Sequence, residues 1–261
     1  VKDDTIFIDV RSPIEYKNGT IEGAINIPIL TEEERALVGT AYKQISVDEA
    51  RRLGIQYISP KMLSIYDEIL KLKNTNKNLT AFCARGGYRS TFFSNAFTSI
   101  GVKVYKLHGG YKCYRKIVLQ KLPEINEEVT YIVIHGNTGV GKTEILHVLK
   151  DKGLDILDLE GAANHRGSLL GSIGLGECSS QKTFESKIYH QLDNAKSKYI
   201  FIEAESRRIG KVMVPKYIHE KMRQGIHIYV DADIDYRVNI LKKDYILNDS
   251  WIKESIQSIE K

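Results

Sequence analysis

The residues from Cys83 to Ser90, CARGGYRS, have types and spacing suited to an anion-binding loop beside a nucleophile. Gly86 and Gly87 let the backbone curl so that several N–H groups point toward one centre. That field favours a thiolate at Cys83, and Arg89 would clamp the bound anion with its planar guanidinium group. We predict that Cys83, Arg85 and Arg89 are catalytic, and that Gly86, Gly87, Tyr88 and Ser90 line the loop.

An inert buried thiol at a strand end is the alternative interpretation of Cys83. The glycines and arginines argue against it, because they cost stability unless they bind an anion. Cys113 and Cys178 lack such a loop, although Cys113 lies in a basic segment and could act as a resolving thiol. Without a C-x-x-C pair the three cysteines give no sign of a zinc or dithiol centre, and they fit a reduced, cytoplasmic setting.

A second anion-binding segment, GNTGVGKT, occupies residues 136–143 between a predicted strand and a predicted helix. It is the complete phosphate-loop pattern, whose N–H groups wrap a diphosphate or triphosphate. Lys142 would reach the outer phosphates and Thr143 would hold a Mg²⁺ ion. The predicted diphosphate-binding residues are Gly136, Gly139, Gly141, Lys142 and Thr143. Whether ATP binds is left open.

Polar clusters follow two later strands, at the edge where α/β sheets place ligands. Their carboxylates Asp158, Glu160, Glu203 and Glu205 are candidates for the metal side of the site. Either Glu203 or Glu205 would stand where nucleotide hydrolases usually have aspartate, which argues against ordinary ATP turnover. The ligand or RNA candidates are Glu160, His165, Arg166, Glu203, Glu205, Arg207 and Arg208. The simpler interpretation is a set of solvated loop residues.

These loops need sheets to position them, and the sequence alternates β-rich runs with helical patterns. Strands are predicted at residues 5–10, 24–27, 79–83 and 102–107, then at 131–135, 154–159, 199–203 and 226–230. Helices are predicted at 60–72, 91–100, 142–150 and 215–223. This alternation predicts parallel α/β sheets. Residues 120–128, QKLPEINEE, read as a linker between domains 1–124 and 125–261.

Composition excludes several classes of protein. With 42% hydrophobic and 27% charged residues, the 261-residue chain is neither disordered nor fibrous. No apolar run is long enough to span a membrane, and no membrane partner is expected. The net charge is only +5, but residues 61–122 carry many lysines and arginines and only two acidic residues, Asp67 and Glu68. This stretch is predicted to face an anion.

The first half resembles a rhodanese domain in three motifs: FIDVRSPIEY at residues 7–16, GTIEGAINIP at 19–28 and LHGGY at 107–111. The resemblance implies that Asp9 and Arg11 form a buried structural ion pair. The five residues between Cys83 and Arg89 are one more than simple sulfurtransferases usually have, and resemble the rhodanese-like phosphatases. We therefore expect the loop to prefer a phosphate-like donor to a bare sulfane.

The two halves together resemble the tRNA 2-selenouridine synthase family over nearly the whole chain. The second half contributes the phosphate loop, LEGAANHRGS at residues 159–168 and EAESRRIG at 203–210. Ala84 departs from the family, which often has Trp there. Members usually continue beyond the position of Lys261, so we expect a C-terminal helical part to be missing here. The implied fold is a rhodanese-like parallel-sheet domain followed by a P-loop NTPase-like α/β domain.

The resemblance implies an enzyme that replaces sulfur by selenium at C2 of the wobble 2-thiouridine of tRNA, with selenophosphate as donor. It also implies prior transfer of a geranyl group from geranyl diphosphate to that sulfur. The phosphate loop would hold the diphosphate with Mg²⁺, and Cys83 would act on or carry the selenium. The implied partners are tRNA and an enzyme that supplies selenophosphate.

Other classes of function remain as alternatives. A rhodanese-fold phosphatase or sulfurtransferase would use Cys83 and Arg89 but would leave the second half unexplained. A P-loop kinase or ATPase would use Lys142 and Thr143 and leave the cysteine loop unexplained. A non-catalytic RNA-binding module would give neither loop a purpose.

Overall fold

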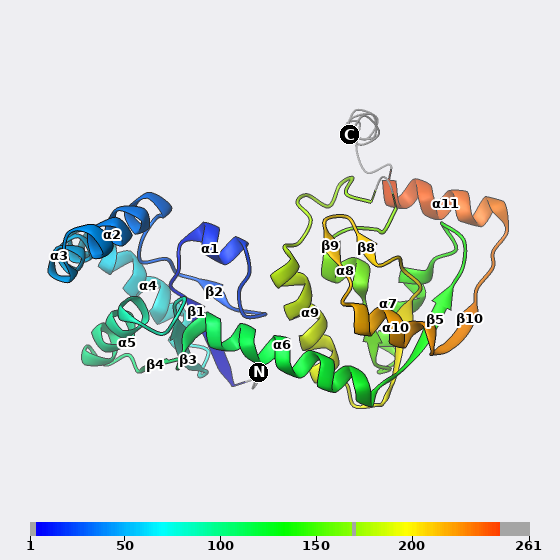
Figure 1. Cartoon of the computed structure of the whole chain (residues 1–261), viewed down its shortest axis with the longest axis horizontal. Helices are drawn as coiled ribbons and strands as arrows, with labels where there is room; N and C mark the ends of the chain where they lie inside the picture. Colours follow the sequence, from blue (N-terminus) through cyan, green and yellow to red (C-terminus); the bar gives the residue numbers. More distant parts are fainter. Residues whose placement is uncertain (1–3, 169–170, 246–261) are drawn as a thin grey trace. The chain divides into compact units, whose positions relative to one another are not determined.

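The computed structural model describes residues 4–168 and 171–245 and divides the chain into two compact units, Val1–Ile117 and Val118–Lys261 (Figure 1). Each unit has its own parallel sheet and its own buried core. The α/β fold class predicted from the sequence is confirmed. Within the described residues, no helix combines the length and the apolar character that crossing a bilayer requires.

The first unit is built on four parallel strands in the order β2-β1-β3-β4. The strands are β1 (Thr5–Asp9), β2 (Ile25–Asn26), β3 (Asn78–Phe82) and β4 (Val104–Lys106), at the four predicted places. The helices are α1 (Pro13–Lys17), α2 (Glu32–Gln44), α3 (Val47–Ile58), α4 (Met62–Lys73) and α5 (Tyr88–Ser99), with a 3-10 turn at Ser59–Lys61. Helix α6 (Gly110–Glu128) begins in this unit and continues past its last residue, Ile117. Ile8, Ala81 and Phe93 pack in the core of this unit.

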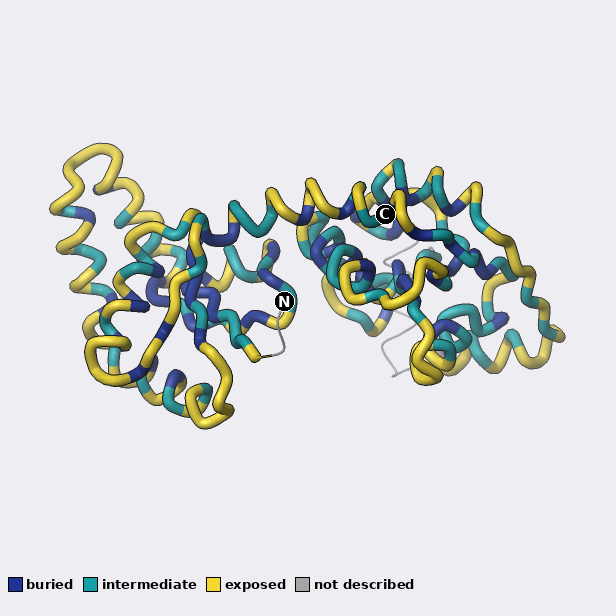
Figure 2. Tube along the Cα trace, turned by 90° about the horizontal axis from the view of Figure 1, so that it is seen from below, coloured by how far each residue is buried: buried dark blue, intermediate teal, exposed yellow. Residues whose placement is uncertain are grey.

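Helices α2 and α3 lie side by side as a pair at the edge of the first unit, and the sequence patterns considered above did not predict them (Figures 1 and 2). The N-termini of both helices nonetheless carry capping residues that the sequence shows. Thr31 caps α2 and accepts a hydrogen bond from the N–H of Glu34, and Ser46 caps α3 in the same way toward Glu49. Most of their residues are exposed or half-buried, so periodicity alone gives a weak signal here.

The ion pair implied for Asp9 and Arg11 is present and buried. Arg11 Nη2 donates to Asp9 Oδ2 at 2.6 Å and also to the carbonyl of Gly19 at 2.7 Å. Thr20 Oγ1 donates to the same carboxylate at 2.8 Å. These contacts fix the end of β1 to the segment before β2, so the pair has a structural role.

Removing one member of this pair should be costly. Asp9→Asn is expected to lower the free energy of unfolding by about 3 kcal/mol, because it leaves the Arg11 guanidinium buried without its counter-charge. Urea unfolding followed by circular dichroism measures this change in the free energy of unfolding. The control is Asp48→Asn in the exposed pair with Arg51, which should leave the midpoint unchanged. Equal midpoints for the two variants would contradict the structural role.

The second unit has four parallel strands in the order β10-β5-β7-β6. They are β5 (Thr130–His135), β6 (Ile156–Leu157), β7 (Tyr199–Glu203) and β10 (Ile226–Tyr229); β8 (Arg208–Ile209) and β9 (Val212–Met213) pair separately in antiparallel fashion. The helices are α7 (Lys142–Asp151), α8 (Leu159–Ala163), α9 (Gln181–Asp193), α10 (Lys216–Arg223) and α11 (Ile234–Tyr245). Tyr131, Phe184 and Ile200 are fully buried in its core.

The structure refines two sequence expectations. The segment at residues 120–128, predicted as a linker, is helical and forms the last part of α6, with Pro123 inside the helix. Leu122 is buried in the core of the second unit, and Asn126 accepts a hydrogen bond from Tyr131 Oη at 3.0 Å. The strand expected at residues 154–159 is shorter, because Asp158 caps α8 by accepting from the N–H of Gly161 at 2.7 Å.

Candidate functional site

The cysteine loop joins the end of β3 to the start of α5 and is seated on the first turn of α6. The N–H of Tyr111 donates to the carbonyl of Cys83 at 2.9 Å. Gly86 and Gly110 both have positive φ, at +66° and +58°. A Cβ on Gly110 would lie 2.2 Å from the Cys83 carbonyl oxygen, so only glycine allows this close approach. The LHGGY motif thus shapes the floor of the loop.

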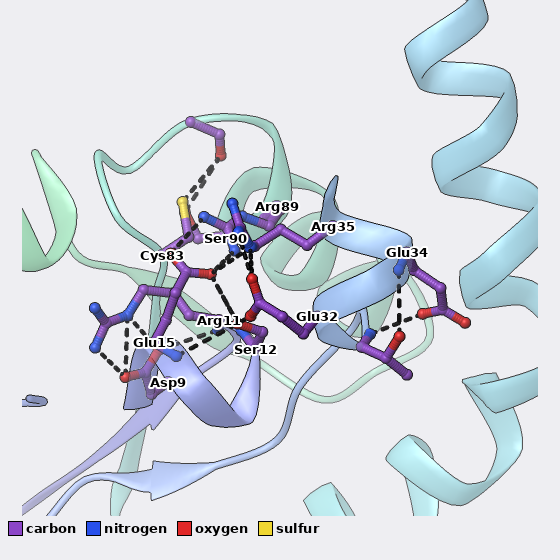
Figure 3. A network of polar contacts seen from close by, with 12 residues as sticks. Asp9, Arg11, Ser12, Glu15, Glu32, Glu34, Arg35, Cys83, Arg89 and Ser90 are labelled. Carbon is purple, nitrogen blue, oxygen red and sulfur yellow. Dashed lines mark hydrogen bonds and ion pairs between the residues drawn. The ribbon is translucent and has the colours of Figure 1, made fainter. Parts of the chain in front are cut away.

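The Cys83 thiol is buried, yet its surroundings favour the thiolate. Burial raises its pKa, but hydrogen bonds from the Ser90 hydroxyl and from the N–H groups of Ser90 and Arg85, with the charge of Arg89, more than offset this. The pKa of Cys83 therefore lies below its usual value. Ser90 Oγ lies 3.2 Å from the sulfur (Figure 3). The geometry fits a nucleophile at the start of a helix.

Arg89 is oriented by a carboxylate that the sequence interpretation did not assign to the site. Its Nη1 donates to Glu15 Oε2 at 2.6 Å and its Nη2 to Glu15 Oε1 at 3.2 Å (Figure 3). Burial raises the pKa of Glu15, but the hydrogen bond and charge of Arg89 hold it below its usual value. Ser12 and Arg35 extend the network, with Arg35 Nε 4.0 Å from Glu15. Glu15 is thus a positioning residue.

The remaining loop residues face outward. Arg85, Gly87 and Tyr88 are exposed, whereas Gly86 is half-buried. Tyr88 Oη accepts a hydrogen bond from Arg51 Nη2 at 2.9 Å, which ties the loop to α3. The loop therefore combines a buried thiol with exposed groups that a large substrate could contact.

The phosphate loop follows β5 and opens α7, as predicted. Gly139 and Gly141 have φ of +84° and +81°, and Gly141 caps the helix. Lys142 Nζ donates to the carbonyl of Gly136 at 3.2 Å. The loop borders a cavity of about 360 Å³ that Glu160, Arg166 and Glu205 also line. This charged cavity has the composition expected of a phosphate and metal site.

Thr143 lies between two glutamates at the ends of neighbouring elements. Its Oγ1 is 3.1 Å from Glu160 Oε2 and 3.1 Å from Glu203 Oε2. A hydroxyl carries one proton, so one carboxyl must be protonated if both contacts are hydrogen bonds. Burial, followed by the charge of Glu205, raises the pKa of Glu160 to about 7. Burial, followed by the charge of Glu160, raises the pKa of Glu203 well above its usual value.

This arrangement predicts a pH-dependent stability. As pH rises from about 4.5 to about 7, unfolded Glu160 loses a proton that folded Glu160 keeps, so the contribution of Glu160 to stability falls through this window and is constant above it. Glu160→Gln lacks this effect and should unfold with about 3 kcal/mol more free energy than wild type at pH 8. Near pH 4, the unfolding free energies of Glu160→Gln and wild type should be equal, because Glu160 is then protonated in the folded and the unfolded protein.

Thermal unfolding across pH measures the difference between Glu160→Gln and wild type. The control is Glu144→Gln, whose side chain is 45% exposed, and it should keep the wild-type pH dependence. A Glu160→Gln variant that is less stable than wild type at pH 8 would show that the carboxylate is needed in its charged form.

The comparisons with known proteins match a family model to each half of the chain. The model of the rhodanese-like domain matches residues 1–117, and the model described as the tRNA 2-selenouridine synthase AAA domain matches residues 129–260. The chain belongs to the tRNA 2-selenouridine synthase family. The tRNA 2-selenouridine synthases of Nitrosomonas europaea and Pseudomonas syringae pv. tomato are 35% and 34% identical to it, each over 94% of this chain. It spans 64% of the first relative and 67% of the second.

A solved domain is also similar. The N-terminal domain of a protein from Clostridium difficile 630, described as ATP/GTP binding, is 44% identical over 45% of this chain and 92% of that one, with a TM-score of 0.44.

In this family member, the other predicted residues divide into those beside the phosphate loop and those away from it. Gly167 packs between two carboxylates, since a Cβ there would lie 2.5 Å from Glu205 Oε2 and 2.8 Å from Glu160 Oε1. His165 packs between Gly171 and Gly210 instead of facing this cavity. Arg207 and Arg208 are exposed, and neither is among the described residues that line the cavity beside the phosphate loop. Their predicted ligand roles stay predictions.

The fit of a Mg²⁺ ion can be judged from the oxygen donors beside Thr143. No group of three His, Cys, Asp or Glu side chains with metal-binding geometry occurs in the described part of this tRNA 2-selenouridine synthase family member. The Thr143 hydroxyl and the carboxylates of Glu160 and Glu203 are nevertheless the hard oxygen ligands that Mg²⁺ takes together with phosphate and water. These residues fit such an ion.

Proposed function

We propose that this chain carries the selenation activity for which its relatives are named, exchanging sulfur for selenium at C2 of the wobble 2-thiouridine in tRNA. The observation that supports the proposal is the presence of two different anion loops in one chain. One loop carries the activated thiol of Cys83, and the other carries Lys142 and Thr143 beside a carboxylate pair. A reaction with two anionic co-substrates gives each loop a role.

The phosphate loop is proposed to bind geranyl diphosphate. The sulfur of 2-thiouridine attacks the first carbon of the geranyl group, an S–C bond forms, the C–O bond to diphosphate breaks, and the N3 proton is released. Lys142 and the backbone N–H groups would stabilise the charge that develops on the leaving diphosphate. Bound Mg²⁺ would supply further charge neutralisation there, with Thr143, Glu160 and Glu203 holding it. ATP has no step in this scheme.

The cysteine loop is proposed to bind selenophosphate. The loop spacing fits a tetrahedral anion, Arg89 is held in place by Glu15, and the Cys83 thiolate is placed to attack the phosphorus of selenophosphate. An S–P bond forms, the P–Se bond breaks, and selenide is released. Selenide then adds to C2, the C2–S bond breaks, and geranylthiol leaves after taking up a proton, while water hydrolyses the phosphocysteine to phosphate and free Cys83. Thioether sulfur is a better leaving group than the thiocarbonyl sulfur it replaces, which gives the geranylation its purpose.

Binding of tRNA is proposed to use the basic stretch at residues 61–122. Arg85 and Lys106 are exposed there, and phosphate contacts of this kind position RNA without reading its sequence. The proposed setting is the cytoplasm, with a separate enzyme supplying selenophosphate.

The deciding experiment incubates the chain with thiolated tRNA, geranyl diphosphate and selenophosphate and identifies the nucleosides by mass. S-geranyl-2-thiouridine and 2-selenouridine are expected, and the absence of both would contradict the proposal. Turnover of an aryl phosphate that depends on Cys83 would favour a phosphatase instead. Hydrolysis of ATP that is indifferent to tRNA would favour an ATPase.

A further inference from the structure

The first unit contains a cavity of about 360 Å³ to which neither proposed co-substrate has been assigned. It lies between α2, α3 and α5, and its walls are almost entirely hydrocarbon. The apolar side chains lining it include Val38, Tyr42, Ala50, Ile55, Ile58 and Phe92. Its size lies in the range of about 300–1,000 Å³ that is typical of small-molecule sites.

This apolar pocket adjoins the cysteine loop. Tyr88 and Arg89, both loop residues, form part of its wall, together with Thr91 and Phe92 in the first turns of α5. Ser90, between them in sequence, places its hydroxyl 3.2 Å from the sulfur of Cys83. A ligand that fills the pocket would therefore lie against Tyr88 and Arg89, on the same loop that carries Cys83.

The lining selects a class of ligand. A free uracil or ribose would bury polar groups without partners, which is costly. The arginines at the pocket are already bound: Arg89 to Glu15, and Arg51 to Asp48 and Tyr88. A hydrocarbon chain needs no hydrogen bonds and gains from leaving water.

We propose that this pocket binds the prenyl chain of S-geranyl-2-thiouridine, so that the C2–S bond of the modified base is presented to the Cys83 loop. The inference rests on the proposed function for the identity of the chain. It adds that the two co-substrate sites differ in kind: the diphosphate is held at the charged cavity of the second unit, and the hydrocarbon is held in the first unit for the selenation step.

Two glycines provide a matched pair of variants. Gly54 lines the pocket from α3, and a Cβ added there would meet nothing within 4 Å. Gly39, on α2, has equally open space but does not line the pocket. Both sit in helices, so Gly54→Leu and Gly39→Leu should each improve helix propensity rather than unfold the unit. Only the leucine side chain of Gly54→Leu would fill the pocket.

The measurement is the dissociation constant of the full chain for two anticodon stem-loop RNAs, one carrying S-geranyl-2-thiouridine and one carrying S-methyl-2-thiouridine. Wild type and Gly39→Leu are expected to prefer the geranylated RNA by about tenfold or more, since several methylene groups become buried. Gly54→Leu should lose most of this preference while binding the S-methyl RNA as wild type does.

Either of two results would overturn the inference: no preference for the geranylated RNA in wild type, or an undiminished preference in Gly54→Leu. Nucleoside formation by wild type, measured in parallel, separates this from failure of the proposed function. If wild type forms 2-selenouridine but shows no pocket-dependent preference, only the pocket inference fails. A different result is that wild type forms neither product, while wild type and Gly39→Leu prefer the geranylated RNA and Gly54→Leu does not. In that case the proposed function fails, but the pocket is still a hydrocarbon-binding site.

Discussion

Cys83→Ser is expected to abolish selenation of S-geranylated tRNA, with a fall in rate of at least about a thousandfold, while geranyl transfer continues. Serine matches the shape of cysteine, so the buried site should keep its packing against Ser90. The hydroxyl is not ionised under conditions where the thiol of Cys83, with its lowered pKa, readily forms the thiolate. The variant should therefore accumulate S-geranyl-2-thiouridine, measured by nucleoside mass analysis.

The matched control is Cys113→Ser in α6 of the same unit. Cys113 packs against Gly109, and a serine there should leave both products unchanged. Loss of selenation in Cys113→Ser would instead give this cysteine the resolving role that its basic segment allows. A Cys83→Ser variant that forms 2-selenouridine at the wild-type rate would exclude nucleophilic selenium chemistry at this loop.

Both anion loops could be predicted from the sequence because each is a local pattern. The glycines and the charged residue that closes each loop lie within eight residues of one another, between a strand and a helix. The strands were also predictable, since buried parallel strands read as short β-branched runs. Residue order within one loop is enough to define such a site.

Glu15 could not be assigned in this way, because it lies far along the chain from the arginine it orients. Its signal was the capping box that it forms with Ser12, which is a structural feature rather than a catalytic one. Likewise, the pairing of Glu160 with Glu203 depends on how α8 follows β6 beside β7. Contacts that depend on sheet order are not visible in a single sequence.

The pocket between α2, α3 and α5 escaped prediction for a related reason. Its residues come from three helices and from the segment before α2, and many of them, such as Tyr42 and Ile55, are exposed. Exposed apolar residues are common on protein surfaces and carry no signal singly. They become informative only when the fold gathers them into one cavity beside a reactive loop.

Lys142→Met is expected to have the opposite effect to Cys83→Ser. Methionine keeps the apolar stem but removes the charge that would neutralise the departing diphosphate, so geranyl transfer should fall by about a hundredfold or more. Selenation of RNA that already carries S-geranyl-2-thiouridine should continue, because that step uses the cysteine loop. Initial rates with each RNA, followed by nucleoside mass analysis, separate the two steps.

Lys150→Met provides the control, since Lys150 is exposed near the end of the same helix α7. It removes the same charge from the same element, so any effect shared by both variants reflects net charge and tRNA attraction rather than leaving-group stabilisation. If Lys142→Met slowed selenation of pre-geranylated RNA as strongly as it slows geranyl transfer, the two loops would serve one step. The reciprocal loss of one product in each variant is therefore what a division of labour between the two loops requires.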